Sequence, residues 1–303
     1  MSKILLLAGG NSPEREISLR SGAAVRAALE QTGHEVMVVD PANELADNVF
    51  GGYDAIFPVL HGTGGEDGVL QARLESLGHH NFVGSDAASS ALCFDKWRYK
   101  ELIASDAITT PQGEQITAAM LRTHQLAQAP FVLKPHTGGS SVDTFIVRDI
   151  MSADFAAMEA ACERYGTMLI EALIEGTEIT IGILGDRALP VIEIIPPSDG
   201  EFDYENKYNG KTQELCPPLN VPEDTQLLAS KLALQIHRLC GCRDFSRTDM
   251  MIAADGTLYV LETNTIPGMT DESLLPKAAA TAGINMPTLC DQLVQMAASR
   301  TNG

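Results

Sequence analysis

Two carboxylates near the C-terminus, Asp249 and Glu262, lie in apolar segments that could pair as a β-hairpin. The segments 245–252 and 258–264 flank an Asp-Gly dipeptide at 255–256, which is typical of a tight turn between antiparallel strands. A two-residue turn at this dipeptide predicts that Asp249 faces Glu262 across the hairpin. Like charges in directly facing positions destabilise a sheet unless something compensates them.

The same register places Arg247 opposite Asn264, on the face that carries the two carboxylates, because side chains alternate along a strand. Two carboxylates and an amide oxygen suit a hard cation. Mg²⁺ usually binds one or two carboxylates and leaves its other positions to water and substrate phosphates. Asp249, Glu262 and Asn264 therefore predict a metal site, and they indicate a protein that handles a nucleoside triphosphate.

Lys134 ends an apolar segment, 130–134, and a glycine-rich loop follows it at 137–141. Glycines let the backbone turn tightly and direct N–H groups toward an anion. The lysine precedes the glycines, so the order differs from that of a Walker A loop. The pattern alone leaves two readings open, a phosphate-binding loop and an ordinary hairpin loop.

Strands and helices alternate through roughly the first 90 residues, which predicts a parallel sheet covered by helices. Ser12, followed by Pro13, is expected to cap the first long helix. Ligands of such sheets bind at the carboxyl ends of the strands, here the Gly9-Gly10 loop and 61–68. The expected strands are Lys3–Ala8, Glu35–Val39 and Asp54–Leu60, and the expected helices are Pro13–Thr32 and Gly68–Leu77.

Four further side chains have both a functional and a simpler reading. Glu14, in the first turn of a helix, is favoured there by the helix dipole. His61 lies after a strand and before glycines, so it is either a satisfied core imidazole or a functional group. Glu171 and Glu178 flank a short connection, where exposed loop acids are the simpler reading. The strands and helices of this later part do not alternate regularly, which indicates α+β character.

The composition limits the function classes. The chain has 303 residues and a net charge of −19, whereas nucleic-acid binding needs a basic face, so nucleic acid is not expected as a partner. No apolar run reaches the length of a membrane span, so no membrane is expected either. The six cysteines are dispersed and no export signal is evident, which favours reduced thiols and a cytoplasmic protein.

Taken in order, these motifs resemble those of the D-alanine–D-alanine ligases of the ATP-grasp superfamily, and the resemblance covers nearly the whole chain. Its motifs are Ser12-Pro-Glu-Arg-Glu-Ile-Ser-Leu19, His61-Gly-Thr-Gly-Gly-Glu-Asp-Gly68, Asp95-Lys96, Lys134-Pro135, Gly139-Ser-Ser-Val142, Glu171, Glu178, Lys207-Tyr208, Arg247-Thr-Asp249 and Glu262-Thr-Asn-Thr-Ile-Pro-Gly-Met-Thr-Asp-Glu-Ser-Leu274.

The resemblance implies an N-terminal Rossmann-like parallel α/β domain over 1–92, followed by a two-part ATP-grasp fold of α+β character. Its central subdomain would span 93–176, and its C-terminal subdomain, with the metal and catalytic site, 177–303. The resemblance also implies ATP and Mg²⁺ as cofactors, with Mn²⁺ as a possible substitute, and a homodimer. In this family ATP phosphorylates the carboxylate of one D-alanine. The amine of a second D-alanine then attacks the acyl phosphate, giving the dipeptide used for peptidoglycan, ADP and phosphate.

Roles follow from the resemblance residue by residue. Lys96 and Lys134 would hold the phosphates of ATP, the segment 171–174 would meet adenine, and Glu178 would meet the ribose. The residues assigned to ATP are Lys96, Lys134, Ser140, Glu171, Ala172, Leu173, Ile174, Glu178 and Lys207. Asp249, Glu262 and Asn264 would hold the metal.

A second set of residues is assigned to the amino-acid substrates. Glu14 would anchor the ammonium of the first D-alanine with His61 close by, and Ser273 and Leu274 would position the second D-alanine. Arg247 and the backbone of Gly268 would stabilise the oxyanion of the tetrahedral intermediate. The residues assigned to catalysis are Glu14, Ser140, Tyr208, Arg247 and Ser273, with Ser140 linking Glu14 and Tyr208.

Two residues, Asp143 and Tyr208, bear on how the chain compares with this family. Asp143 stands where the family usually has glycine, and an acid near a triphosphate is expected to point away from it. Tyr208 stands where relatives that make D-alanyl-D-lactate differ, which favours an amine as the second nucleophile.

Two alternative functions remain open. The first alternative is an ATP-grasp ligase that joins other amino acids. The second is a nucleotide-binding protein without catalysis, which the presence of metal ligands, lysines and Arg247 disfavours.

Overall fold

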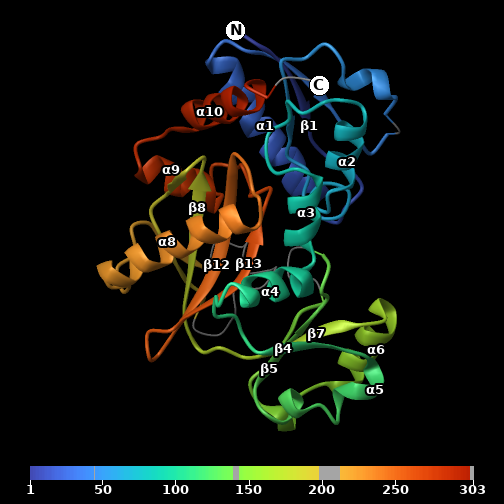
Figure 1. Cartoon of the computed structure of the whole chain (residues 1–303), viewed down its shortest axis with the longest axis vertical. Helices are drawn as coiled ribbons and strands as arrows, with labels where there is room; N and C mark the ends of the chain where they lie inside the picture. Colours follow the sequence, from blue (N-terminus) through green and yellow to red (C-terminus); the bar gives the residue numbers. More distant parts are fainter. Residues whose placement is uncertain (44, 139–142, 198–211, 301–303) are drawn as a thin grey trace.

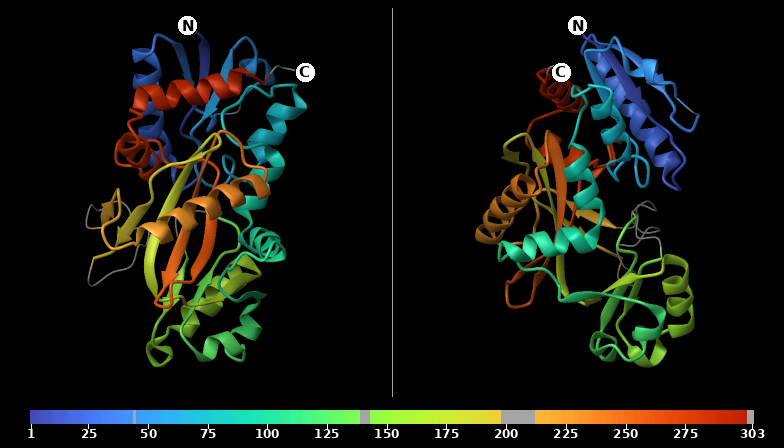
Figure 2. Two further views of the ribbon diagram at one scale, coloured as in Figure 1. Left: turned by 60° about the vertical axis from the view of Figure 1, so that its left-hand side comes forward. Right: turned by 45° about the vertical axis from the view of Figure 1, so that its right-hand side comes forward.

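The computed structural model describes residues 1–43, 45–138, 143–197 and 212–300. Figures 1 and 2 show three tiers along the long axis of the molecule. An N-terminal sheet lies at the top of Figure 1, a large sheet in the middle and a small sheet at the bottom. Each sheet is partly covered by helices.

The N-terminal sheet has the order β2-β1-β3 and is parallel, as the alternating pattern predicted. Its strands are β1 (Lys3–Leu7), β2 (Glu35–Val39) and β3 (Ala55–Pro58), and its helices are α1 (Arg15–Gln31), α2 (Val69–Ser76) and α3 (Ala87–Phe94). Every residue of β3 is buried, and so is β1 after Lys3, because α1 packs on one side and an apolar cluster around Leu5 and Phe50 on the other. A short 3₁₀ helix, η1 (Asp47–Phe50), supplies Phe50.

The predicted cap of the first helix is wrong. Helix α1 begins at Arg15 with Glu14 as its N-cap residue, and no side chain caps it. The Ser12 hydroxyl donates instead to the backbone oxygen of His61 at 2.7 Å and accepts from the amide of Glu14 at 3.2 Å. Ser12 therefore ties the loop after β1 to the loop after β3, which is a long-range contact that a local capping rule does not consider.

The large sheet has the order β11-β10-β8-β12-β13, with β9 also pairing with β8, and all these pairs are antiparallel. Its strands are β8 (Gly176–Leu184), β9 (Arg187–Ala188), β10 (Ile192–Ile195), β11 (Gln213–Leu215), β12 (Phe245–Ala253) and β13 (Leu258–Asn264). Helix α8 (Glu223–Leu239) buries its apolar stripe against β8 and β12, around Ile181 and Met250.

The small sheet has the antiparallel order β4-β7-β5-β6. Its strands are β4 (Gly113–Ile116), β5 (Phe131–Lys134), β6 (Phe145–Val147) and β7 (Met168–Ala172), and the helical segments beside it are α5 (Ala118–Leu121), η2 (Gln125–Gln128), η3 (Ile150–Ser152) and α6 (Phe155–Tyr165). Only residues 173–175 separate β7 from β8, so the chain passes directly from the small sheet to the large one. The segment assigned to adenine thus lies where the two sheets adjoin.

Helix α4 (Lys96–Ser105) packs on the large sheet, although it precedes the small sheet in the chain. Tyr99 and Ile103 are buried in the apolar cluster of β8, β12 and β13, and the Tyr99 hydroxyl lies 2.8 Å from the hydroxyl of Thr263. Helix α9 (Leu274–Thr281) contacts β8, and helix α10 (Met286–Ala298) returns to the N-terminal sheet to pack on α1 and β3. The domain boundaries at 92 and 176 stay a prediction.

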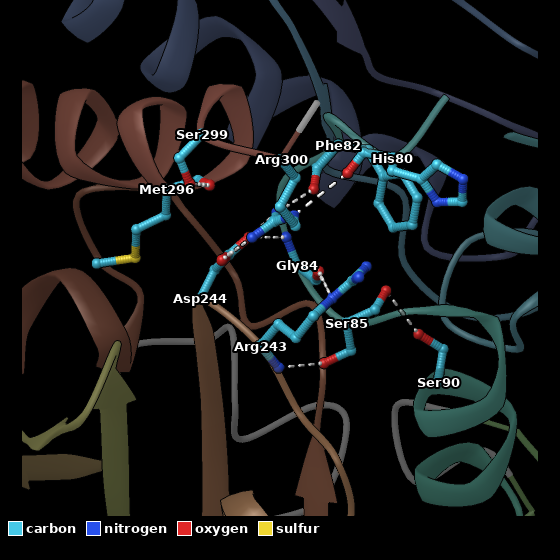
Figure 3. Close-up of polar contacts among 10 residues, drawn as sticks. All are labelled: His80, Phe82, Gly84, Ser85, Ser90, Arg243, Asp244, Met296, Ser299 and Arg300. Carbon is cyan, nitrogen blue, oxygen red and sulfur yellow. Dashed lines mark hydrogen bonds and ion pairs between the residues drawn. The ribbon is translucent and has the colours of Figure 1, made fainter. Parts of the chain in front are cut away.

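An ion pair joins Arg300, just after α10, to Asp244 at the start of β12 (Figure 3). The guanidinium of Arg300 lies 2.7 Å from both carboxylate oxygens of buried Asp244 and donates to the backbone oxygen of Phe82 at 2.6 Å. Asp244 also accepts from the amide of Gly84 at 2.7 Å, and its own φ is +59°. This ion pair therefore fixes the start of β12 against the segment that follows the N-terminal sheet.

Across the described ranges, no helix has both the length and the apolar content that crossing a membrane requires. All six cysteines are free thiols, and all except Cys216 are buried.

Candidate functional site

The predicted hairpin is present, and it brings the expected side chains together. Strands β12 and β13 pair antiparallel with Asp249 opposite Glu262 and Arg247 opposite Asn264. The turn itself differs from the prediction. The amide of Ala253 donates to the backbone oxygen of Thr257, so the loop has three residues rather than two, and Gly256 adopts a φ of +85°.

The longer turn does not displace the site, because a bulge compensates for it. Near the turn Met250 pairs with Val260, and the register shifts between Asp249 and Met250 so that Leu261 is the extra residue. A β-bulge adds one residue to one strand and moves every later pair by one position. The predicted facing of the two carboxylates is therefore correct, whereas the reason given for it, a two-residue turn, is wrong.

Arg247 and Asp249 form a bidentate ion pair along β12. Arg247 Nε lies 2.9 Å from Asp249 Oδ1, and a terminal nitrogen lies 2.8 Å from Oδ2. Thr180, which faces Asp249 from β8, donates its hydroxyl to Oδ1 at 2.5 Å. The fork of the guanidinium matches a carboxylate in this geometry, so the arginine is held in a fixed orientation on the face of the sheet.

Two lysines approach the same face from other elements. Lys96, the first residue of α4, lies 3.3 Å from a carboxylate oxygen of Glu262 and donates to the backbone oxygen of Gly138 at 2.8 Å. Asp95 caps that helix by accepting from two backbone amides, and this fixes the position of Lys96. Lys134 ends β5, and burial alone would lower its pKa. The charges of Glu171 and then Glu262 raise the pKa of Lys134 above its ordinary value.

Glu171 is not an exposed loop acid. It belongs to β7, is 3% exposed, and lies between two ammonium groups, Lys100 at 2.7 Å and Lys134 at 2.5 Å. Burial alone would raise the pKa of Glu171, but the charges of Lys134 and Lys100 lower it below its ordinary value. Glu178 is likewise in a strand, β8, where it is half-buried opposite Ile194. The simpler reading of both acids, as exposed loop residues, is wrong.

The residues assigned to the first D-alanine lie near the carboxyl end of β3. His61 is buried, and its Nε2 lies 3.5 Å from the hydroxyl of Ser21. Burial, opposed by a hydrogen bond with the backbone of Ile266, lowers the pKa of His61 to about 4, so its imidazole is neutral. The Glu14 carboxylate lies beside Gly62, since a Cβ on that glycine would be 2.7 Å from its Oε2.

A second acid, Glu66, lies in the same region. It is 7% exposed and accepts from the amide of Gly62 at 2.6 Å. Burial, followed by the charge of Glu14, raises the pKa of Glu66 from 4.5 to about 8. Glu66 is therefore predominantly protonated near neutral pH. The sequence interpretation included Glu66 in a motif but gave it no role.

The loop between β13 and α9 faces this region. Ser273 is the N-cap residue of α9, Leu274 is its first residue, and the Ser273 hydroxyl accepts from the amide of Thr270 at 3.0 Å. A Cβ on Gly268 would be 2.7 Å from that hydroxyl oxygen, so only glycine fits there without displacement. The amide of Met269 donates to the hydroxyl of Ser21, which ties the loop to α1 of the N-terminal tier.

Three assigned residues, Ser140, Lys207 and Tyr208, lie outside the described residues. The polar network in which Ser140 links Glu14 and Tyr208 therefore stays a prediction. Asp143 is described, with a φ of +54°. Its carboxylate accepts from Arg164 at 3.0 Å and from the hydroxyl of Tyr165 at 2.8 Å. The side chain therefore points to the end of α6, where its charge is paired.

The predicted metal ligands fit Mg²⁺ only as an incomplete set. Throughout the described residues no group of three or more His, Cys, Asp or Glu side chains could hold a metal ion. Asp249 and Glu262 supply two facing carboxylates, and Asn264 Oδ1 already accepts from the amide of Ile266 at 2.8 Å. Such a set suits Mg²⁺, which takes few protein ligands and completes its shell with water and phosphate oxygens.

Comparison with known proteins identifies the family. A family model described as the C-terminus of D-Ala D-Ala ligase matches residues 99–295. A D-alanine–D-alanine ligase from Desulforudis audaxviator is 39% identical to the chain, over 98% of this chain and 99% of that protein. The chain belongs to the D-alanine–D-alanine ligase family.

Solved structures of D-alanine–D-alanine ligases and related enzymes share the fold. The Bacillus anthracis D-alanine–D-alanine ligase complexed with ATP is 31% identical, with a TM-score of 0.83 over 98% of this chain and 97% of that one. The VanG D-Ala:D-Ser ligase from Enterococcus faecalis is 26% identical, with a TM-score of 0.83 over 98% and 99% of the two chains. The expected α/β and α+β architecture of an ATP-grasp ligase is thus confirmed.

Two buried residues of this ligase escaped the sequence interpretation. Lys100 contacts Glu171, and Glu66 lies near Glu14. A signal for Lys100 was present, because it follows Lys96 by four residues and positions i and i+4 share a helix face. No comparable local signal marks Glu66, because its burial depends on how the loop after β3 folds over it.

Proposed function

We propose that this protein joins two D-alanines to D-alanyl-D-alanine with the conversion of ATP to ADP and phosphate. The observation that carries the proposal is the convergence of Lys96, Lys134 and Arg247 on the face that bears Asp249 and Glu262. Phosphoryl transfer to a carboxylate needs mainly positioning and charge neutralisation, and cations held in fixed geometry provide both.

The nucleotide side is supported by elements from both sheets. Lys96 and Lys134 would bind the phosphates, and the segment 171–174, where β7 leads into β8, would contact adenine. Glu178, two residues into β8, would accept from the ribose hydroxyls. A nucleotide placed there would lie between the small and large sheets, and the similarity to a ligase complexed with ATP supports this placement.

The amino-acid side is supported by charge and hydrogen bonding. Glu14 would bind the ammonium of the first D-alanine, with neutral His61 beside it. The first step transfers the γ-phosphoryl group of ATP to the carboxylate of that D-alanine. The amine of the second D-alanine, positioned by Ser273 and Leu274, then attacks the acyl carbon. Phosphate leaves with the C–O bond electrons, and the amine loses a proton.

Arg247 has a defined task in the second step. Attack of the amine places negative charge on the acyl oxygen, and a preorganised cation or N–H group stabilises that charge. Arg247 and the backbone N–H of Gly268 would be these donors. Asp249, Glu262 and Asn264 would hold Mg²⁺, with Mn²⁺ as a substitute, and the metal would neutralise charge on the phosphates of ATP. Lys207 would join the lysines that bind ATP, and Ser140 would link Glu14 to Tyr208.

A phosphate-release assay with ATP, Mg²⁺ and a panel of amino acids tests the proposal. We expect release with D-alanine, none with L-alanine, and a product whose mass matches the dipeptide. Lys277→Met controls for the general effect of replacing a lysine, because its ion pair with Glu214 lies outside the phosphate-binding face. Absence of phosphate release with D-alanine would refute the proposal.

One observation favours a second candidate. The chain is as similar in fold to a D-Ala:D-Ser ligase as to the D-alanine–D-alanine ligase complexed with ATP. The alternative is therefore a ligase that takes D-serine as its second substrate. Competition between D-alanine and D-serine, with the two dipeptides separated by mass, distinguishes the candidates, because a D-serine enzyme would form the mixed dipeptide in excess.

We further propose that the protein is a cytoplasmic homodimer. The free thiols support the compartment, and the family resemblance supports the dimer. The substrates ATP and D-alanine would be met in that compartment. Sedimentation of the purified chain tests the oligomeric state, and a monomer at micromolar concentration would contradict the homodimer.

A further inference from the structure

Lys100 is a buried lysine to which neither the motifs nor the proposed reaction gives a role. It is 6% exposed, and its ammonium lies close to three oxygen atoms of the protein. These atoms are Glu171 Oε1 at 2.7 Å, the Thr110 hydroxyl at 2.7 Å and the Pro111 backbone oxygen at 2.5 Å. The side chain is thus held in place by an ion pair with Glu171 and by hydrogen bonds to Thr110 and Pro111.

Lys134 shares the same carboxylate but is less constrained. Its ammonium lies 2.5 Å from Glu171 Oε2, and its side chain is 13% exposed. Lys134 and Lys100 therefore bind opposite oxygens of one buried acid, and two positive charges face one negative charge. One lysine suffices to neutralise Glu171, which leaves the other available to an anion.

Helix α4 explains how the two lysine sites are connected. Lys96 and Lys100 lie one turn apart on one face of the helix. Lys96 reaches Glu262 on the large sheet, whereas Lys100 reaches Glu171 on the small sheet. Through Thr110 and Pro111, Lys100 also holds the segment that leads into β4, whose Gly113 pairs with Glu171.

A buried carboxylate without a positive partner is strongly unfavourable. If Lys134 moved toward the phosphates of ATP with no second cation beside Glu171, the acid would be left in that state. Lys134 would then stay paired with Glu171, and the nucleotide would lose one of its cations. Lys100 removes this conflict because it remains in place when Lys134 moves.

We propose that Lys100 is a positioning residue that holds and neutralises Glu171, so that Lys134 is free to bind the phosphates of ATP. The inference deepens the proposed function and rests on it only for the identity of the anion. It predicts that loss of Lys100 acts on nucleotide affinity and not on the amino-acid sites.

The first test is Lys100→Met, which keeps the aliphatic stem and removes the charge. We expect the Kd for a non-hydrolysable ATP analogue with Mg²⁺, measured by calorimetry, to rise by roughly 10-fold or more. The KM for ATP should rise in parallel, whereas the KM for D-alanine and kcat at saturating ATP should change by less than about 3-fold.

Arg300→Met is the matched control, because it also removes the cation from a buried ion pair, Arg300–Asp244, away from the nucleotide lysines. It should lower the melting temperature without a comparable rise in the Kd for the nucleotide. If Lys100→Met lowers the melting temperature in the same way and leaves the Kd unchanged, Lys100 has only a structural role and the proposal is overturned.

A double-mutant cycle with Glu171→Gln provides the second test. Because Lys100 acts through the charge of Glu171, adding Lys100→Met to Glu171→Gln should change the Kd by less than about 2-fold. This comparison remains valid if Lys100→Met alone does not fold, since the double variant has no unpaired buried acid. A further loss of about 10-fold in the Glu171→Gln background would show that Lys100 acts independently of Glu171, and would overturn the proposal.

Calorimetry measures nucleotide binding without an amino acid, so it can test the role of Lys100 separately from the ligase function. A wild-type chain that binds the nucleotide analogue but releases no phosphate with D-alanine would refute the ligase function and leave the Lys100 test intact. A wild-type chain that binds no nucleotide would refute both.

Discussion

Replacing Glu66 by Gln should change how the stability of the protein depends on pH. Glu66 is 7% exposed, accepts from the amide of Gly62 and lies near the charge of Glu14. A glutamine has the shape of the protonated acid and can accept the same hydrogen bond, but it cannot ionise. The substitution therefore removes one titration and little else.

The direction follows from the pKa of Glu66, which burial raises from 4.5 to about 8. The folded protein binds this proton more tightly than the unfolded chain does. The stabilisation is therefore fully present below pH 4.5, and it is lost progressively as the pH rises through 8. A rise of about 3.5 in pKa, at 1.36 kcal/mol for each pKa unit, gives an upper limit of ~5 kcal/mol.

Urea unfolding of the wild type and of Glu66→Gln, at about pH 5 and about pH 8.5, measures this loss. We expect the wild type to lose several kcal/mol more than the variant between the two conditions. Glu30→Gln, on the exposed side of α1, controls for removing one negative charge. If the difference in unfolding free energy between wild type and Glu66→Gln is the same at both pH values within ~1 kcal/mol, Glu66 is ionised throughout and the reasoning is refuted.

Three further predictions concern the site. Glu262→Gln should reduce kcat by more than roughly 100-fold, because it removes a carboxylate from the metal-binding pair, and unchanged phosphate release would contradict the metal assignment. Gly268→Ala should raise the KM for D-alanine by roughly 10-fold or more and leave the KM for ATP unchanged. The reason is that the new Cβ would lie 2.7 Å from Ser273 Oγ. Equal increases in the KM for D-alanine and the KM for ATP would exclude a local effect. The pKa of His61 is lowered to about 4, so its contribution to stability should be present above pH 6.5 and lost by ~3 kcal/mol as the pH falls through 4. His61→Gln should flatten this part of the unfolding profile, and an unchanged profile would show that His61 is charged in the folded state.

The sequence predicted the architecture well, because hydrophobic periodicity and strand–helix alternation are local signals. The boundaries of β2, from Glu35 to Val39, agree with the prediction. Packing between distant segments was not predictable in the same way. Neither the return of α10 to the N-terminal sheet nor the packing of α4 on the large sheet has a local signal.

The hairpin shows how a correct prediction can rest on an incorrect reason. Asp255-Gly256 did mark the turn, but Gly256 closes a three-residue loop, and the extra residue Leu261 restores the register at the carboxylates. A three-residue turn shifts every pair by one position relative to a two-residue turn. Without a bulge, this shift would place the two acids on opposite faces of the sheet. The facing of Asp249 and Glu262 was preserved only because the bulge lies between the turn and the site.

The buried charges explain how a chain with a net charge of −19 could bind a triphosphate. Each cation of the proposed site already has an internal acid: Arg247 pairs with Asp249, Lys96 with Glu262, and Lys134 with Glu171. Binding of ATP with Mg²⁺ would exchange these partners. The phosphates would take Lys96 and Lys134, the metal would take the carboxylates of Asp249 and Glu262, and Arg247 would turn to the acyl oxygen. Neither set of charges is left uncompensated in this exchange. Glu171 is too deeply buried to receive a metal, and it is the acid for which the protein supplies a second lysine.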